Sequence, residues 1–186
     1  MQERDNVLRI FQETKAAVAS GNSAKIRSLS NQTTNTASLT QDPDNIAAAV
    51  VVYALSKIIE REDYKSLPGW KNFYSNYIGS IDKIIDAIKR EDDKGYRQNI
   101  AIIRGAIGKL SGKLKDYIQD VFRRASINKA SRIYEHGISM ENTAKLLGVS
   151  LFELADYAGQ GRYADIPEAK TIDEKARLKI AMEMFS

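Results

Sequence analysis

The sequence contains no cysteine and only one histidine, which removes several kinds of chemistry. Without cysteine there is no disulfide, no thiolate nucleophile and no cysteine-ligated zinc. The single histidine, His136, precedes Gly137 at the predicted end of a helix, where a positive charge interacts favourably with the helix dipole. It has neither a cysteine nor a second histidine with which to bind a metal. We therefore predict no metal site and no cofactor.

Recognisable catalytic patterns are missing as well. Serines are frequent, but none lies in the Gly-x-Ser-x-Gly turn of a serine hydrolase. Neighbouring carboxylates, as at 60–62 and 91–93, fall on charged turns and helix ends, where they serve as caps and solubilising groups. We predict that the protein is not an enzyme.

Long apolar segments are absent too. The longest, 46–55, has ten residues, whereas a membrane-spanning helix needs about 20. The first residues are charged and lack the apolar core of a secretory signal. We expect a cytoplasmic protein that makes no membrane contact.

Apolar residues recur every three or four positions along most of the chain, and no stretch alternates long enough for a sheet. This pattern predicts an all-α fold. The helix expected over 43–62 is apolar nearly all round and should be the most buried element. The expected helices cover 3–20, 24–29, 43–62, 70–90, 96–122, 127–135 and 171–185, with a helix-turn-helix over 139–157, a polar loop over 30–42 and an irregular segment over 162–167.

We divide the chain into an N-terminal bundle of helices over 1–122 and a C-terminal helix-turn-helix unit over 123–186. Gly105, Gly108 and Gly112 lie within a predicted helix, where each costs about 1 kcal/mol relative to alanine. Such a series predicts either close contact between helices or a bend near Gly112.

Aromatic residues form a stripe from position 70 to 77, comprising Trp70, Phe73, Tyr74 and Tyr77. The same spacing continues as isoleucine, which cannot stack on bases, so a core position is favoured. A stacking platform for single-stranded nucleic acid is the alternative.

Positive charge is concentrated in one part of the chain. The net charge is +4, but the stretch 104–132 has eight basic and only two acidic residues. A surface that contacts phosphates would show this pattern, although a solvated helix face would as well. The predicted phosphate contacts are Lys109, Lys113, Arg123, Arg124, Lys129, Arg132 and Lys145.

The stretch 139–157 has the pattern of a helix-turn-helix, which is most often a reader of double-stranded DNA. Ser139 is a suitable N-cap for the first helix, and Gly148 stands at the turn, where a positive φ is needed. Ser150 then caps the second helix and would lie near the DNA groove. A small residue, Ala144, allows the two helices to approach closely.

The second helix of this motif begins with Leu151 and Phe152, followed by acidic Glu153. Bases are normally read by Arg, Lys, Asn or Gln, and a carboxylate repels phosphates. Leu151 and Phe152 fit a contact with a partner protein at least as well. A DNA-binding regulator and a non-catalytic protein-interaction module therefore remain alternative predictions.

The segment 130–154, with Ile138-Ser139, Ala144, Leu147-Gly148-Val149-Ser150 and an acidic-hydrophobic helix, resembles the core of small prokaryotic, often archaeal, antitoxin-type helix-turn-helix proteins. In that family the antitoxin is commonly paired with a PIN-type ribonuclease toxin. The resemblance covers about residues 130–158. It implies a DNA-facing or dimer-forming unit over 139–157 and a toxin-binding C-terminal tail.

The last predicted helix is amphipathic and must pack on its own domain or on another chain. Its apolar strip comprises Ile172, Ala176, Ile180, Met184 and Phe185. A single helix-turn-helix covers one half-site of DNA, and specific recognition usually needs two. We therefore expect a homo-oligomer, or a complex with a toxin or another partner protein.

Overall fold

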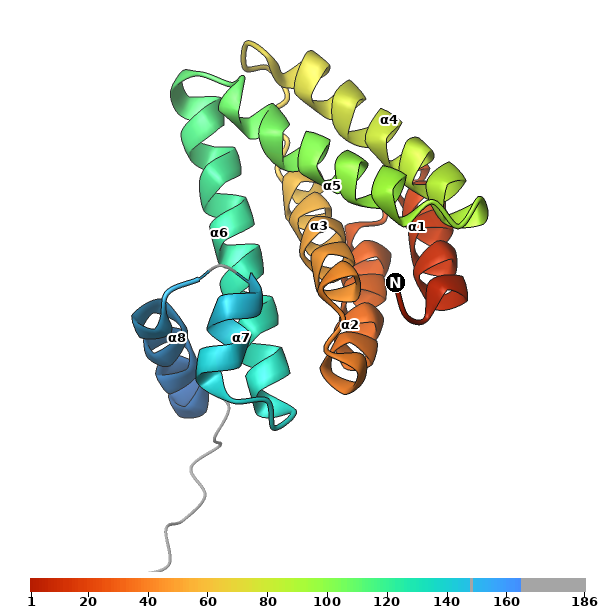
Figure 1. Cartoon of the computed structure of the whole chain (residues 1–186). Helices are drawn as coiled ribbons and strands as arrows, with labels where there is room; N and C mark the ends of the chain where they lie inside the picture. Colours follow the sequence, from red (N-terminus) through yellow and green to blue (C-terminus); the bar gives the residue numbers. More distant parts are fainter. Residues whose placement is uncertain (148, 165–186) are drawn as a thin grey trace, which may run out of the picture.

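The computed structural model describes residues 1–147 and 149–164, and every regular element in these ranges is an α-helix. The predicted all-α class is confirmed for this part of the chain. The helices are α1 (Arg4–Ala19), α2 (Ser23–Thr40), α3 (Pro43–Glu60), α4 (Trp70–Lys89), α5 (Asp93–Gly108), α6 (Gly112–Glu135), α7 (Met140–Leu147) and α8 (Leu151–Ala164) (Figure 1).

Two helical hairpins and the long helix α6 form the body of the protein. In the first hairpin α2 packs against α3, and in the second α4 packs against α5. Helix α1 contacts both α2 and α4, and α6 packs along α3. Helices α7 and α8 lie together against one end of α6 (Figure 1). One cluster of buried apolar side chains extends from α1 to α8.

Helix α3 supplies the centre of this core, as its sequence predicted. Twelve of its 18 residues are buried, more than in any other described helix. The helix begins at the expected residue. The Asp42 carboxylate accepts the Asp44 N–H at 2.8 Å, and Pro43 occupies the first position of the helix, where a backbone N–H would have no acceptor within the helix. Tyr77 of α4 donates its hydroxyl to the Val51 carbonyl at 2.7 Å, which ties the two hairpins together.

The aromatic stripe of α4 contributes to the core. Trp70, Phe73 and Tyr77 are buried, while Tyr74 is half-buried and stacks on Trp70 with ring centroids 5.6 Å apart. The prediction of a core stripe is confirmed for the three buried rings.

The prediction of a loop over 30–42 is wrong, because α2 runs through most of it without interruption. Small polar side chains usually favour loops, since they compete for backbone hydrogen bonds. Here Thr33 donates to the Leu29 carbonyl one turn earlier, at 3.1 Å. Ser30 donates to the Ala49 carbonyl of α3 at 2.7 Å. The hydroxyls are thus satisfied inside the α2–α3 contact.

The helix predicted over 96–122 is in fact two helices. Helix α5 ends at Gly108, and α6 begins after Ser111, whose backbone is extended with φ −138°. Gly112 has φ +56°, a left-handed conformation that favours glycine. The bend predicted near Gly112 is therefore a complete break. No close helix contact explains Gly105 or Gly108, since a β-carbon at either would meet nothing within 4 Å.

Helix α6 continues without interruption, so the separate helix predicted over 127–135 is also wrong. Its 24 residues cross the boundary drawn between 122 and 123. Buried residues on both sides of that boundary, such as Ile118 and Ala130, belong to the same core. His136 is the C-cap of α6, and Gly137 follows with φ +92°.

One further prediction, on the segment at the end of the described residues, is wrong. Residues 162–164, predicted to be irregular, belong to α8. The predicted turn residue Gly148, the helix predicted over 171–185 and the predicted toxin-binding tail lie outside the described residues.

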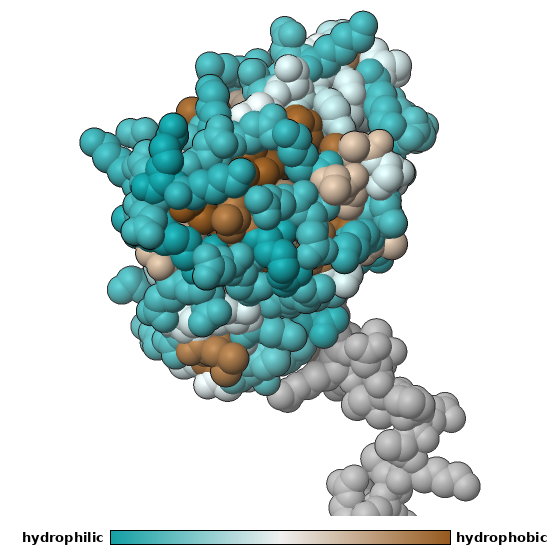
Figure 2. Space-filling model, turned by 90° about the vertical axis from the view of Figure 1, so that its right-hand side faces the viewer, coloured by the Kyte–Doolittle hydropathy of each residue, from teal (hydrophilic) through white to brown (hydrophobic). Residues whose placement is uncertain are grey.

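The surface is mainly hydrophilic on the face shown in Figure 2, with small hydrophobic areas instead of one continuous apolar face. Within 1–147 and 149–164, no helix combines the length and the hydropathy that crossing a membrane requires. The exposed large apolar side chains in these ranges include Leu39, Ile102, Leu151, Phe152 and Tyr157.

Candidate functional site

Helices α7 and α8 are joined by a short connection, and both helices have side-chain caps. Ser139 accepts the Asn142 N–H at 3.2 Å at the start of α7, as its sequence predicted. In the connection, the Val149 N–H donates to the Ala144 carbonyl at 3.1 Å. The inward side chains of the two helices, Ala144, Leu147 and Leu154, are buried in the common core.

The start of α8 is closed by reciprocal hydrogen bonds between Ser150 and Glu153. Ser150 Oγ accepts the Glu153 N–H at 3.1 Å, while the Glu153 carboxylate accepts the Ser150 N–H at 3.0 Å and its hydroxyl at 2.7 Å. This arrangement is a capping box, and it satisfies the donors at the helix start. The Ser150 hydroxyl, predicted to lie near a DNA groove, thus already donates within the protein.

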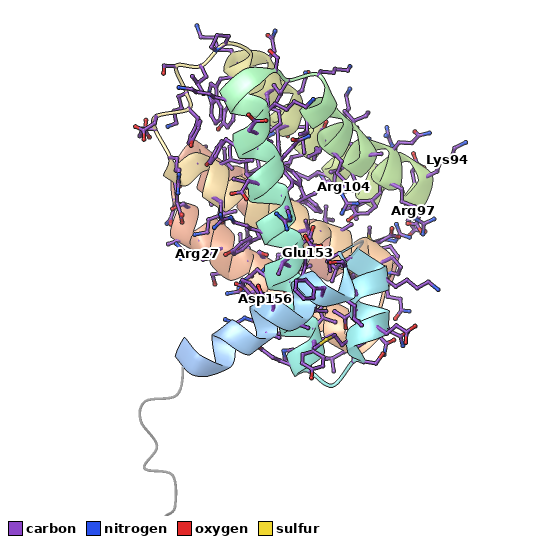
Figure 3. The ribbon with its side chains drawn as sticks, turned by 90° about the vertical axis from the view of Figure 1, so that its left-hand side faces the viewer. Arg27, Lys94, Arg97, Arg104, Glu153 and Asp156 are labelled. Atoms are coloured by element: carbon purple, nitrogen blue, oxygen red, sulfur yellow. The ribbon has the colours of Figure 1, made fainter. Side chains whose placement is uncertain are left out.

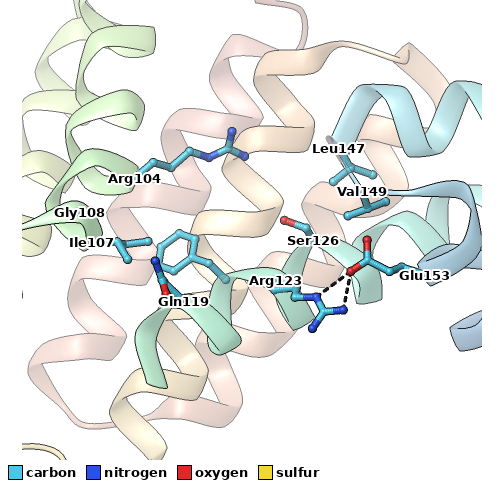
Figure 4. Close-up of a pocket in the computed structure, with 10 residues that line it drawn as sticks. Arg104, Ile107, Gly108, Gln119, Arg123, Ser126, Leu147, Val149 and Glu153 are labelled. Carbon is cyan, nitrogen blue, oxygen red and sulfur yellow. Dashed lines mark hydrogen bonds and ion pairs between the residues drawn. The ribbon is translucent and has the colours of Figure 1, made fainter. Parts of the chain in front are cut away.

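Glu153 also connects α8 to α6 through an ion pair. Its Oε1 atom lies 2.6 Å from Nη2 of Arg123 (Figure 4). The hydrogen bonds from Ser150, followed by the bond from Arg123, lower the pKa of Glu153 to about 2. The carboxylate therefore stays charged in neutral and mildly acidic solution, and it fixes the position of α8 on α6.

Leu151 and Phe152 follow the cap and point away from the core. Leu151 is 53% exposed and Phe152 is 81% exposed. Burial of each side chain against a partner would contribute about 1.5–3 kcal/mol. We call these two residues the α8 apolar pair.

Lys129 does not fit the phosphate contact predicted for it, because its side chain is completely buried. Its Nζ donates to Oδ1 of Asn31 in α2 at 2.9 Å and lies 4.4 Å from the centroid of the Tyr53 ring in α3. Burial, and to a smaller extent the charge of Arg132, lowers the pKa of Lys129 to about 7. The ammonium therefore lies at the junction of α2, α3 and α6 and cannot reach a phosphate in this structure.

Arg123 and Arg124 are exposed but engaged with carboxylates. Adjacent residues of a helix lie about 100° apart around its axis, so the two side chains leave α6 in different directions. Arg123 reaches Glu153 of α8, while Arg124 pairs with Asp120 one turn earlier at 2.8 Å. A sequence run of basic residues is thus divided between two sides of the helix.

The other predicted phosphate contacts are exposed and distributed over three helices. Lys109 is the C-cap of α5, and Lys113 lies in the first turn of α6. Arg132 lies in the last turn of α6 and Lys145 in the last turn of α7. None of the four has an ion pair within 1–147 and 149–164.

A groove of about 610 Å³ lies between α5, α6 and the connection from α7 to α8 (Figure 4). Its apolar lining consists of Ile107, Phe122, Leu147 and Val149, and its polar lining of Arg104, Gln119, Arg123, Ser126 and Glu153. Gly108 completes the lining at the end of α5. Sequence reasoning missed this groove, because it is formed by three separate segments; the unexplained Gly108 was the only local signal.

Most of the carboxylates noted in the sequence have structural partners. Glu60 pairs with Arg27 and Lys57, and the Asp92 side chain accepts the Gly95 N–H at the start of α5. Among the described residues, no group of three or more His, Cys, Asp or Glu side chains is arranged to hold a metal ion.

Comparison with known proteins gives no relative for this chain. No protein-family model matches it, and no curated protein or solved structure shows significant similarity to it.

Proposed function

We propose that this protein is a non-catalytic interaction module that binds a partner protein through the α8 apolar pair. The observation that carries the proposal is the exposure of Leu151 and Phe152 in the first turn of α8. Aromatic side chains are enriched among the residues that dominate the energy of protein interfaces, and a partner that covered them would remove a large apolar area from water.

The neighbouring residues support this proposal. The capping box and the Arg123–Glu153 ion pair hold the first turn of α8 in a defined position on α6. A rigid anchor loses little conformational entropy on binding, which favours affinity. In this proposal α7 and α8 form a helix-turn-helix unit on a preceding helical bundle, and the unit presents a protein-binding surface.

The competing proposal is a DNA-binding regulator of the antitoxin type. The observation that favours it is the set of exposed cations without ion pairs around the α7–α8 unit, notably Arg132 and Lys145. Lys109 and Lys113, the other predicted phosphate contacts, lie at the opposite end of α6 from Arg132. The start of α8 offers no Arg, Lys, Asn or Gln for base reading, so specificity would have to arise elsewhere.

Affinity purification from an extract of the native cells tests the first proposal. We expect a stoichiometric protein that is retained by the wild type and lost with Leu151→Asp or Phe152→Asp. Leu39→Asp is the matched control, because Leu39 is 87% exposed on α2, away from α8. Equal retention by all the variants would contradict the proposal.

Titration with duplex DNA tests the competing proposal. Phosphate contacts release counterions, so the logarithm of the affinity should fall linearly with the logarithm of the salt concentration. Combining Arg132→Glu with Lys145→Glu should reduce the slope by about two, since each removed contact lowers it by about one. A slope unchanged in this double variant would exclude these contacts.

A further inference from the structure

The α8 apolar pair belongs to the same short stretch of chain that forms one side of the groove. Val149 and Glu153 line the groove, and Leu151 and Phe152 stand between them in the sequence. We infer that the partner of the α8 apolar pair is a second copy of this chain, in which Phe152 enters the groove of the other copy while receiving the other Phe152 in its own groove. This inference rests on the proposed function, because it names the partner of the same surface.

Phe152 cannot fill the groove of its own chain. Residues two positions apart lie about 160° apart around a helix, so Phe152 is on the opposite side of α8 from the buried Leu154. Its exposure of 81% shows that no described part of the same molecule covers it. The ring is therefore available for an apolar site on another molecule.

The groove has the composition of such a site. Its volume of about 610 Å³ lies within the range of roughly 300–1,000 Å³ typical of ligand pockets. Ile107, Phe122 and Val149 provide apolar contact surface. Gly108 has no side chain at the edge of the groove, and a β-carbon built there meets nothing within 4 Å. A glycine in the last turn of α5 costs helix stability but leaves this entrance open.

Arg104 adds a group that favours an aromatic occupant. It is exposed on α5, lines the groove, and has no ion pair within 1–147 and 149–164 (Figures 3 and 4). An arginine guanidinium is attracted to the face of an aromatic ring within about 6 Å. The other arginine that lines the groove, Arg123, forms an ion pair with Glu153. The groove thus offers apolar contacts and one available cation to an incoming phenylalanine.

In this inference the pair and the groove together form a self-complementary surface. A two-fold interface requires the same patch on both subunits, with each projecting residue meeting the recess of the other. Here the projecting residue is Phe152 of α8, and Val149 and Glu153 on either side of it in the sequence line the groove. Two identical contacts then form together, and the assembly closes as a dimer without further subunits.

Sedimentation equilibrium of the full chain, with variants of each half of the contact, tests this inference. We expect the wild type to be a dimer, and Phe152→Asp to weaken dimerisation about tenfold or more. Gly108→Leu should do the same by filling the groove, and it should keep its fold because leucine favours a helix. The matched controls, Leu39→Asp and Gly79→Leu, change an exposed leucine and an uncrowded helical glycine elsewhere, and both should remain dimers.

Mixing the two weakened variants gives the decisive measurement. The Gly108→Leu chain retains Phe152, and the Phe152→Asp chain retains an open groove, so the mixture regains one intact contact and should form heterodimers. A monomeric wild type, dimers unaffected by both substitutions, or a mixture with no heterodimer would each overturn the inference. A monomeric wild type that still retains a different protein through Leu151 and Phe152 would preserve the proposed function and overturn only the identity of the partner.

Discussion

Lys129 places a titratable amine in the interior, next to a neutral acceptor on Asn31 and the ring of Tyr53. Its pKa is about 7 in the folded protein, compared with an ordinary value of 10.5. Between these values the unfolded chain binds more protons than the folded protein, so the free energy of unfolding rises with pH. Below pH 7 the full cost of protonating the buried amine is present.

Replacing Lys129 with methionine should remove this cost. Lys129→Met keeps an unbranched side chain of similar length and should raise the free energy of unfolding near pH 7 by about 1 kcal/mol or more. The gain should shrink as the pH approaches 10.5, because the wild-type amine is neutral there without cost. Urea unfolding at several pH values measures both effects. Lys145→Met, at an exposed position, is the control and should change little; a less stable Lys129→Met at neutral pH would contradict the prediction.

A second prediction at this scale concerns the cap of α8. Ser150→Ala removes the side-chain partner of Glu153 and should lower the free energy of unfolding by about 1 kcal/mol. It should also raise the pKa of Glu153 from about 2 towards the ordinary 4.5, because Ser150 is the largest cause of the shift. The stabilisation from Glu153 is present above pH 4.5 and is lost as the pH falls towards 2. NMR titration of the carboxyl group would show the change, and an unaltered pKa would disprove the role of Ser150.

Among the helices, those with strong local signals were predictable. Helices α1, α3 and α4 lie within one or two residues of the predicted ranges, because an apolar stripe, an Asp-Pro start and a Pro-Gly break mark them. The helical course of 30–40 was not predictable, since Ser30 finds its acceptor on α3, which is distant in sequence. The groove escaped prediction for the same reason. The N-cap at Ser150 is a local signal and was predicted, whereas its reciprocal bond with Glu153 was not.

Replacing Gly105 and Gly112 with alanine should change the free energy of unfolding in opposite directions. Gly105 lies inside α5 with open space around it, so Gly105→Ala should raise the free energy of unfolding by up to about 1 kcal/mol. Gly112 has φ +56°, and Gly112→Ala should cost about 1–2 kcal/mol, because an L-residue is strained there. Thermal unfolding measures both effects, and each variant is the control for the other because the substitution is the same. Equal shifts of the two melting temperatures in the same direction would contradict the assigned conformations.

At the scale of the whole molecule, helix α6 connects the earlier helices to α7 and α8. This helix crosses the boundary predicted at 122, and its later residues Ala125, Ala130 and Ile133 are completely buried in the core shared with the earlier helices. We therefore expect one cooperative unfolding transition for the described helices.

Truncation tests this expectation. A fragment of residues 1–122 would expose the core that Ala125, Ala130 and Ile133 cover, and we expect it to lack a cooperative transition in urea. A fragment that ends at 135 keeps α6 complete and serves as the comparison. A stably folded 1–122 fragment would instead show that the N-terminal helices form an independent domain.

The hydrogen bond from Ser30 to Ala49 also affects the order in which the chain folds. Helix α2 has few apolar residues and several weak helix formers, so it depends on α3 for its stability. During synthesis α2 leaves the ribosome while α3 is still inside the exit tunnel. The nascent segment should therefore remain without helical structure until α3 has emerged, and the hairpin should then form in a single step.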